Sequence, residues 1–269
     1  MPIHIITMVP SVRPKDGLTV GPSAQIEALR DALRSNDGET PLPILAGDAT
    51  VFASETMSPS AGPFDVVVTK FASIEQYKIA TATEAYKEAL ELGDKVFIYG
   101  FENRSLYIDW GYPALKKVFR FFPNLFVDCK TKADPIDYQK KLDSAELYQA
   151  NGDSGMQNYK LKVANSPDRP FYMLSLIRKN ISPPGTKAAT KYNTEWLKAA
   201  FSYDLNLELA GSIVSLDGGP KAFHDVRIDR YPTRETYIQW MESKVFCELA
   251  ETRRACTLDK QEQIGLAIY

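Results

Sequence analysis

The sequence contains few of the residues that build metal centres and disulfide frameworks. Its 269 residues include three cysteines and two histidines. Cys129, Cys247 and Cys256 do not have the paired spacing of a zinc site or of a disulfide framework. Two histidines cannot form a histidine-rich metal site. We therefore expect no metal ion, and a reducing compartment.

Motifs of nucleotide and hydrolase chemistry are also missing. The chain has no Gly-x-x-x-x-Gly-Lys-Ser/Thr phosphate loop, no Gly-x-Gly-x-x-Gly after a strand, no Gly-x-Ser-x-Gly elbow and no His-Glu-x-x-His zinc motif. Its net charge of −2 gives no basic field that would attract nucleic acid or anionic lipid. No apolar run reaches transmembrane length, and the N-terminus lacks the basic region of a signal peptide. We expect a cytoplasmic protein without a cofactor, a nucleic-acid partner or a membrane partner.

The most informative feature that is present is an internal repeat. Residues 64–77 align with residues 224–237 at a constant offset, since 225 − 65 = 160 and 237 − 77 = 160. The triplet Leu-Ala-Gly at 45–47 recurs at 209–211, an offset of 164 residues. A repeat of this length predicts two related halves instead of one undivided domain.

Local patterns predict the same order of elements in both halves. In the first half we expect strands at 3–9, 44–53, 65–71 and 96–99, and helices at 23–35 and from 73 to before 93. In the second half we expect strands at 172–178, 209–216, 225–231 and 264–268, and helices with a core at 194–201 and after 233. Each half reads β-α-β-β-α-β, the ferredoxin-like arrangement. The predicted fold is α+β, with ferredoxin-like repeats at 1–100 and 168–269.

Residues 101–167 have no counterpart in the repeat and are predicted to be a helical insertion and linker. The segment 112–122 has apolar side chains on one side and Lys116 and Lys117 elsewhere, the pattern of an amphipathic helix. Such a helix can lie on a membrane or dock a partner. The alternative, which we favour, is that it covers a sheet edge or one mouth of the fold. The polar segment 130–168 predicts a linker with a short helix at 138–148.

Two segments of the second half, 171–178 and 224–237, resemble the dimeric α+β barrel superfamily. The likeness includes the aromatic-Pro-Thr turn at 231–233 and is closest to EthD-like members. The superfamily also holds polyketide cyclases, antibiotic-biosynthesis monooxygenases, muconolactone isomerases and haem-dependent branches. Most members pair two sheets face to face as homodimers. The resemblance therefore implies a pseudo-dimeric α+β barrel within one chain, which would be a monomer or a weak homodimer.

The two histidines are candidates for acid–base chemistry because the ordinary pKa of histidine lies near neutrality. His4 lies on the first predicted strand and alternates with Ile6 and Met8. His224 begins the third strand of the second half. These two strands are the central ones of each ferredoxin-like sheet. The alternative for either residue is a histidine that is hydrogen-bonded at a strand end.

A row of charged residues distinguishes the second half from the first. Strand alternation places Asp225, Arg227, Asp229 and Tyr231 on one face of a predicted central strand. The corresponding residues of the first half are Asp65, Val67, Thr69 and Phe71. Charges on a central strand are expected to pair or to line a polar cavity. Either the second half holds a functional cavity, or the row is a ladder of charges facing water.

The resemblance implies a cofactor-independent enzyme that acts on an apolar, oxygenated small molecule. Its chemistry would be that of a cyclase, isomerase, dehydratase or cofactor-free oxygenase, in a cavity between sheet and helices. The predicted catalytic residues are His224, Asp225, Tyr172 and His4. The predicted substrate-binding residues are Arg227, Trp196, Tyr237 and Trp240. Two alternatives stay open: a non-catalytic ligand-binding or scaffold protein, and haem binding through His4 or His224.

Overall fold

A computed structural model describes residues 1–10, 21–52, 64–93, 95–104, 106–121, 170–219 and 221–268. The first half contains β1 (Ile3–Pro10), α1 (Ala24–Arg34), β2 (Leu45–Phe52), β3 (Phe64–Phe71), α2 (Ile74–Thr81), α3 (Glu84–Glu91) and β4 (Phe97–Asn103). A π-helix, η1 (Tyr107–Gly111), and α4 (Tyr112–Phe121) follow. The second half contains β5 (Phe171–Lys179), α7 (Pro183–Ser202), β6 (Asn206–Val214), β7 (Asp225–Tyr231), α8 (Arg234–Met241), α9 (Lys244–Cys256) and β8 (Thr257–Ile268).

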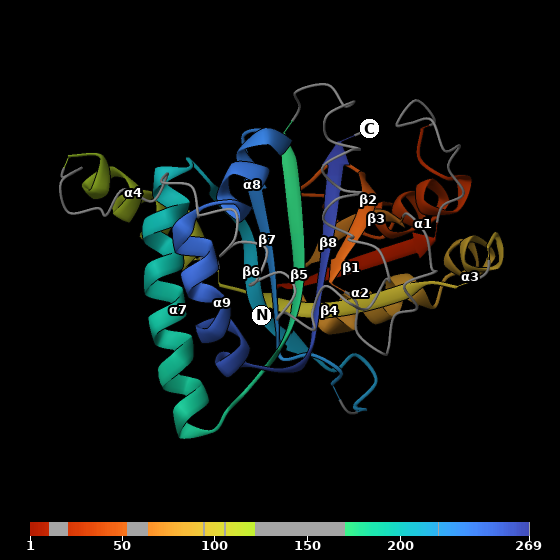
Figure 1. Cartoon of the computed structure of the whole chain (residues 1–269). Helices are drawn as coiled ribbons and strands as arrows, with labels where there is room; N and C mark the ends of the chain where they lie inside the picture. The colour runs from red at the N-terminus through yellow and green to blue at the C-terminus, as the bar shows by residue number, and fades with distance from the viewer. Residues whose placement is uncertain are drawn as a thin grey trace.

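The strands form one closed antiparallel barrel (Figure 1). The strand order is β4-β1-β3-β2 in the first half and β8-β5-β7-β6 in the second, so equivalent strands have equivalent neighbours. Two further pairings, β2 with β8 and β4 with β6, join the halves edge to edge. The sequence predicted a pseudo-dimeric barrel in which two sheets pack face to face. The structure refines this prediction, because hydrogen bonds also connect the edge strands of the two sheets. The predicted α+β class is confirmed.

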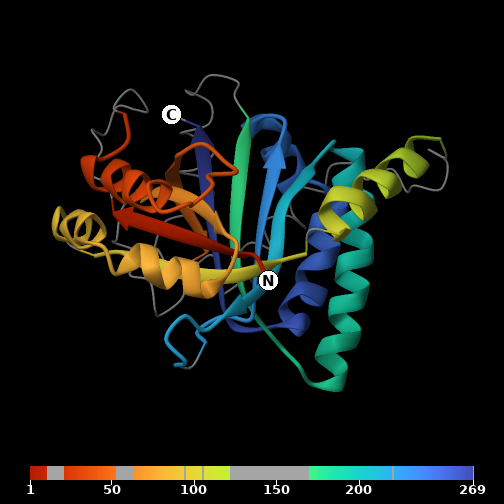
Figure 2. The ribbon, with the colours of Figure 1, turned by 180° about the vertical axis from the view of Figure 1, so that it is seen from behind.

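The strands separate three hydrophobic clusters. On β1, Ile6 and Met8 point into the barrel, while Ile3 and Ile5 point outward, as strand alternation requires. The outer face of the first sheet packs on α1, α2 and α3, and that of the second packs on α7, α8 and α9. Figures 1 and 2 show these two helical layers on opposite sides of the barrel. The barrel interior is itself a packed apolar core over much of its length.

The predicted single helix after Ser73 is wrong, because two helices, α2 and α3, occupy that segment. The hydroxyl of Thr83 accepts a hydrogen bond from the backbone N–H of Tyr86 at 3.4 Å and so starts a new helix. Ser243 does the same for α9, accepting from the N–H of Phe246 at 3.1 Å. These two caps obey the repeat, since 243 − 83 = 160. A serine or threonine that satisfies a free N–H favours a helix start over a continued helix.

Helix α7 begins earlier than the predicted helix core at 194–201. Its first residues, Pro183 and Pro184, are suited to a first turn because they need no backbone donor. Ser182 caps the helix by accepting from the N–H of Gly185 at 3.3 Å. A sequence reading based on apolar spacing missed this turn because its residues are polar or small.

One side of the η1–α4 insertion packs on the second half of the barrel. The Tyr112 hydroxyl donates to the carbonyl of Leu205 at 2.7 Å, and Lys116 Nζ lies 2.7 Å from an oxygen of Asp204. The predicted helix at 112–122 is thus confirmed, and it covers the beginning of β6. Large apolar side chains remain exposed on its other side, including Trp110 at 76% and Phe121 at 80%. The predicted linker at 130–168 and its helix lie outside the described residues.

None of the helices in the described part of the chain is both long and apolar enough to cross a membrane.

Candidate functional site

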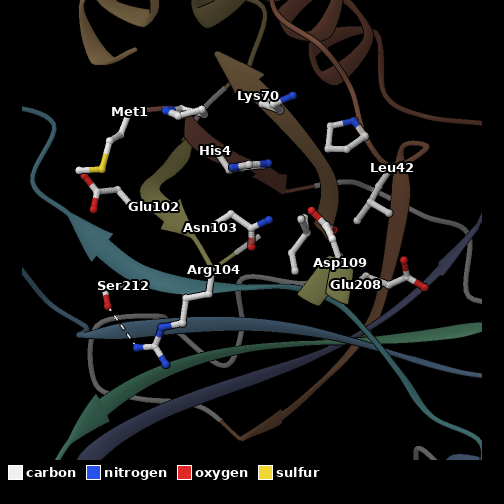
Figure 3. A pocket seen from close by; sticks show the side chains of 13 residues that line it. Met1, His4, Leu42, Lys70, Glu102, Asn103, Arg104, Asp109, Glu208 and Ser212 are labelled. Carbon is white, nitrogen blue, oxygen red and sulfur yellow. Dashed lines mark hydrogen bonds between the residues drawn. The ribbon is translucent and has the colours of Figure 1, made fainter. Parts of the chain in front are cut away.

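A cavity of about 810 Å³ lies at one mouth of the barrel (Figure 3). It forms where β1 and β6 begin and β4 ends, so both halves contribute to its wall. Its polar lining comprises His4, Lys70, Glu102, Asn103, Arg104, Asp109, Glu208 and Ser212. Leu42 and Leu209 form part of the apolar wall of the cavity. A volume of this size is typical of sites for small organic ligands.

His4 is the buried polar residue of this cavity. Alternation along β1 places it on the interior face with Ile6 and Met8, and its ring stacks on Phe101 with centroids 5.2 Å apart. The residue is only 5% exposed, and its Nδ1 atom has no hydrogen-bond partner in the described part of the chain. Burial, and secondarily the nearby Lys70 ammonium, lower the pKa of His4 to about 4. The imidazole is therefore neutral near neutral pH, and a neutral imidazole has one ring nitrogen that can accept a proton or a hydrogen bond.

Asp109 faces His4 across the cavity. Figure 3 shows the Asp109 carboxylate pointing toward the His4 ring. Its negative charge raises the pKa of His4 and so partly opposes the effect of burial. The residue lies in η1, and π-helical turns occur frequently at functional sites. Sequence reasoning did not select Asp109, because its segment has no counterpart in the repeat and matches no motif.

The two cationic side chains of the cavity already have partners, and Met1, which carries the N-terminal ammonium, also lines the wall. Lys70 Nζ lies 2.9 Å from a carboxylate oxygen of Glu39. Arg104 lies 3.6 Å from Asp225 and donates to the Ser212 hydroxyl at 3.3 Å. Within the described residues, Glu102 and Asp109 form no ion pair. The cavity therefore contains two carboxylates, Glu102 and Asp109, that its cationic side chains do not pair with.

His224 lies at the end of a strand and is not among the lining residues. Its Nδ1 atom accepts a hydrogen bond from the backbone N–H of Lys179 at 2.9 Å. The backbone N–H of His224 donates to the carbonyl of Ile177 at 2.8 Å. This is the geometry of the structural alternative, a histidine that is hydrogen-bonded at a strand end. A catalytic role for His224 stays a prediction.

Asp225 and Tyr172 point to opposite faces of the second sheet. Asp225 is on the outer face, where it pairs with Lys179 and with Arg104 of the cavity. Tyr172 is on the interior face and is 5% exposed, and burial raises the pKa of its phenol. The charge of Glu208, a cavity residue, also acts on that phenol. The structure thus brings both residues near the cavity but does not bring them together.

The predicted substrate-binding residues lie in the layer between the second sheet and its helices. Trp196, Tyr237 and Trp240 are buried members of one apolar cluster there. The guanidinium of Arg227 stacks on Trp196 at 4.2 Å, and its Nε lies 2.7 Å from Asp229. Arg227 and Asp229 therefore lie beneath α7, and Asp225 is paired with Lys179 and Arg104, which corrects the alternative of a ladder facing water. Burial raises the pKa of Asp229, and the Arg227 cation opposes that rise.

Comparisons with known proteins give likeness of fold only. No family model and no curated protein matches the sequence. An anthrone oxidase-like protein matches 100% of this chain and 91% of its own length, with 8% identity and a TM-score of 0.47. A protein provisionally assigned as a monooxygenase, from Fusobacterium nucleatum, matches 99% of this chain and 92% of its own, with 10% identity and a TM-score of 0.45. A Rhodopseudomonas palustris protein of unknown function matches 44% of this chain and 95% of its own, with 20% identity and a TM-score of 0.37.

Proposed function

We propose that the chain is a cofactor-independent enzyme that removes a proton from a small organic substrate in the mouth cavity. The resulting substrate anion then reacts with dioxygen. The observation that carries this proposal is His4, a residue that lines the cavity and whose buried Nδ1 atom has no partner among the described residues. A buried polar atom without a partner is costly, and a ligand that bonds to it recovers that cost.

The charges around His4 suit proton transfer from a bound substrate. A pKa of about 4 makes His4 a weak base while the cavity holds no ligand. Transfer of a proton creates an imidazolium, which faces the Asp109 carboxylate (Figure 3). It also creates a substrate anion, and the Lys70 ammonium lines the same cavity, where its exposed ion pair with Glu39 offsets only part of its charge. Each charge that forms in the step therefore has an opposite charge nearby, which lowers the free energy of the transition state.

A second candidate, isomerisation or cyclisation, is favoured by the carboxyl groups of the same cavity. These reactions need an acid that returns the proton at another atom of the substrate. Asp109 and Glu208 both line the cavity and both can carry a proton. In this case no oxygen is consumed, and deuterium from D₂O enters the substrate or product.

Oxygen uptake with anthrone as the probe tests the proposal. Anthrone has acidic methylene protons; one anthrone and one dioxygen give one anthraquinone and one water. We expect the wild-type protein to accelerate uptake over the spontaneous rate, and His4→Gln to lower that acceleration by about a hundredfold. His224→Gln is the matched control and should retain it. Equal uptake by wild-type and His4→Gln protein would contradict the proposal, and deuterium incorporation without oxygen uptake would favour the second candidate.

A further inference from the structure

We infer that the mouth cavity takes an organic cation, a protonated amine carried on an aromatic or hydroxylated skeleton. This inference rests on the proposed function of the cavity, and it names the class of substrate. It starts from the charges of the wall, which come from three separate elements. Glu102 is on β4, Asp109 is on η1 and Glu208 is on β6.

The positive side chains of the wall do not neutralise these carboxylates, and the N-terminal ammonium of Met1, which also lines the wall, forms no ion pair with them among the described residues. Lys70 is 2.9 Å from Glu39, which is not a lining residue, and Arg104 is 3.6 Å from Asp225, which is not one either. Of the three carboxylates, only Glu208 has a basic partner in the described part of the chain. That partner is Arg230, at 3.9 Å. An ammonium group would thus meet two carboxylates that form no ion pair among the described residues, whereas a ligand that arrives as an anion would not be favoured there.

His4 provides an independent indication that a ligand binds here. Its side chain is 5% exposed, and Nδ1 has no partner among the described residues. It shares the cavity wall with the three carboxylates (Figure 3). A neutral imidazole nitrogen bonds well to a hydroxyl or an N–H group. Leu42 and Leu209 offer apolar contact to a carbon skeleton. The wall therefore matches a molecule with a polar hydrogen, an apolar middle and a positive charge.

Three phenols of similar size test the inference: tyramine, 4-ethylphenol and 3-(4-hydroxyphenyl)propionate. They carry a positive, no and a negative charge, and their dissociation constants can be measured by calorimetry at neutral pH and low salt. We expect tyramine to bind about tenfold more tightly than 4-ethylphenol, as one charge-assisted hydrogen bond allows. The propionate should bind most weakly. Asp109→Asn should reduce the preference for tyramine. Glu84→Gln, which removes an exposed carboxylate on α3, should not.

The inference is overturned if 4-ethylphenol or the propionate binds as tightly as tyramine. It is also overturned if none of the three binds at millimolar concentration. The proposed function fails differently: oxygen uptake would then be the same in wild-type and His4→Gln protein, whatever the charge preference. If the Asp109→Asn variant prefers tyramine as strongly as the wild-type protein does, the ammonium group binds away from Asp109, and the inference is also overturned.

Discussion

His4 and His224 are the chain's two histidines, and they lie in different environments. His224 uses Nδ1 to accept from a backbone N–H, whereas Nδ1 of His4 has no partner among the described residues. The scarcity of histidine was enough to select both from the sequence, and strand alternation placed His4 on the same face as Ile6 and Met8. Which histidine meets a cavity depends on barrel closure, and no local pattern encodes that.

The pKa of His4 predicts a contribution to the dependence of stability on pH. The folded value is about 4 and the ordinary value is 6.5, so the unfolded chain takes up this proton first as the pH falls. Stability should therefore fall between about pH 6.5 and pH 4. The loss from this group is at most about 3 kcal/mol, and less where water enters the cavity. Urea unfolding over this range should show a shallower fall for His4→Phe, which keeps the stacking on Phe101. Parallel curves for the two proteins would argue against the low pKa.

The buried pair Arg227–Asp229 makes a second prediction, for which the first half provides the control. The corresponding residues there are Val67 and Thr69. Asp229→Thr alone leaves a buried guanidinium without its carboxylate and should cost about 3 to 5 kcal/mol. The double variant Arg227→Val with Asp229→Thr removes both charges and should be more stable than the single variant. Urea unfolding of the three proteins measures this, and a double variant less stable than Asp229→Thr would count against the argument.

Helix boundaries within the repeat depend on single hydroxyl groups. Ser243 is fully buried; it donates to the Trp240 carbonyl at 2.7 Å and accepts from the Phe246 N–H at 3.1 Å. We expect Ser243→Ala to lower the free energy of unfolding by about 1 to 2 kcal/mol, because it removes a cap and leaves buried groups unbonded. Ser215→Ala is the control, because it removes an exposed hydrogen bond to Asp217 in the loop that connects β6 and β7. Equal losses in the two variants would show that the cap is not important.

The sequence predicted the elements well where a face is buried and poorly where it is not. Strand β7 was expected at 225–231 and spans Asp225–Tyr231, since the apolar residues Val226 and Ile228 alternate with charged ones. The breaks at Thr83 and Ser243 were missed because the apolar spacing continues across them. The first turns of α7 were missed because their residues are polar or small. Asp109 was missed for a different reason: its position follows from how η1 packs against the barrel.

At the scale of the whole molecule, the two halves depend on each other. Strands β2 and β8 pair along one seam between the halves, and strands β4 and β6 pair along the other. Neither sheet therefore has an unpaired edge strand in the described structure. The interior cluster likewise combines residues of both halves. Because the repeat supplies its own partner, we propose that the chain is a monomer or a weak homodimer. The mouth cavity depends on the same closure, since Glu208 of β6 shares its wall with His4 of β1 because β6 pairs with β4.

This interdependence predicts a single cooperative unfolding transition. All three tryptophans, Trp110, Trp196 and Trp240, lie outside the first repeat, so their fluorescence reports on the second half and on the insertion packed against it. Far-ultraviolet circular dichroism reports on both halves. We expect the two signals to change at the same urea concentration, as for a two-state protein. Separate midpoints would show that one half unfolds without the other.

Histidine-labelled nuclear magnetic resonance tests the central claim, that the functional site is the mouth cavity around His4. Protein without a purification tag and labelled with ¹⁵N at histidine has two side-chain signal sets, and His224→Gln assigns them. We predict that the His4 ring stays neutral down to about pH 4 and that its Nδ1 signal shifts when tyramine is added. The His224 signal should not respond to tyramine. An ordinary titration of His4 near pH 6.5, or a response to tyramine at His224 alone, would contradict the account.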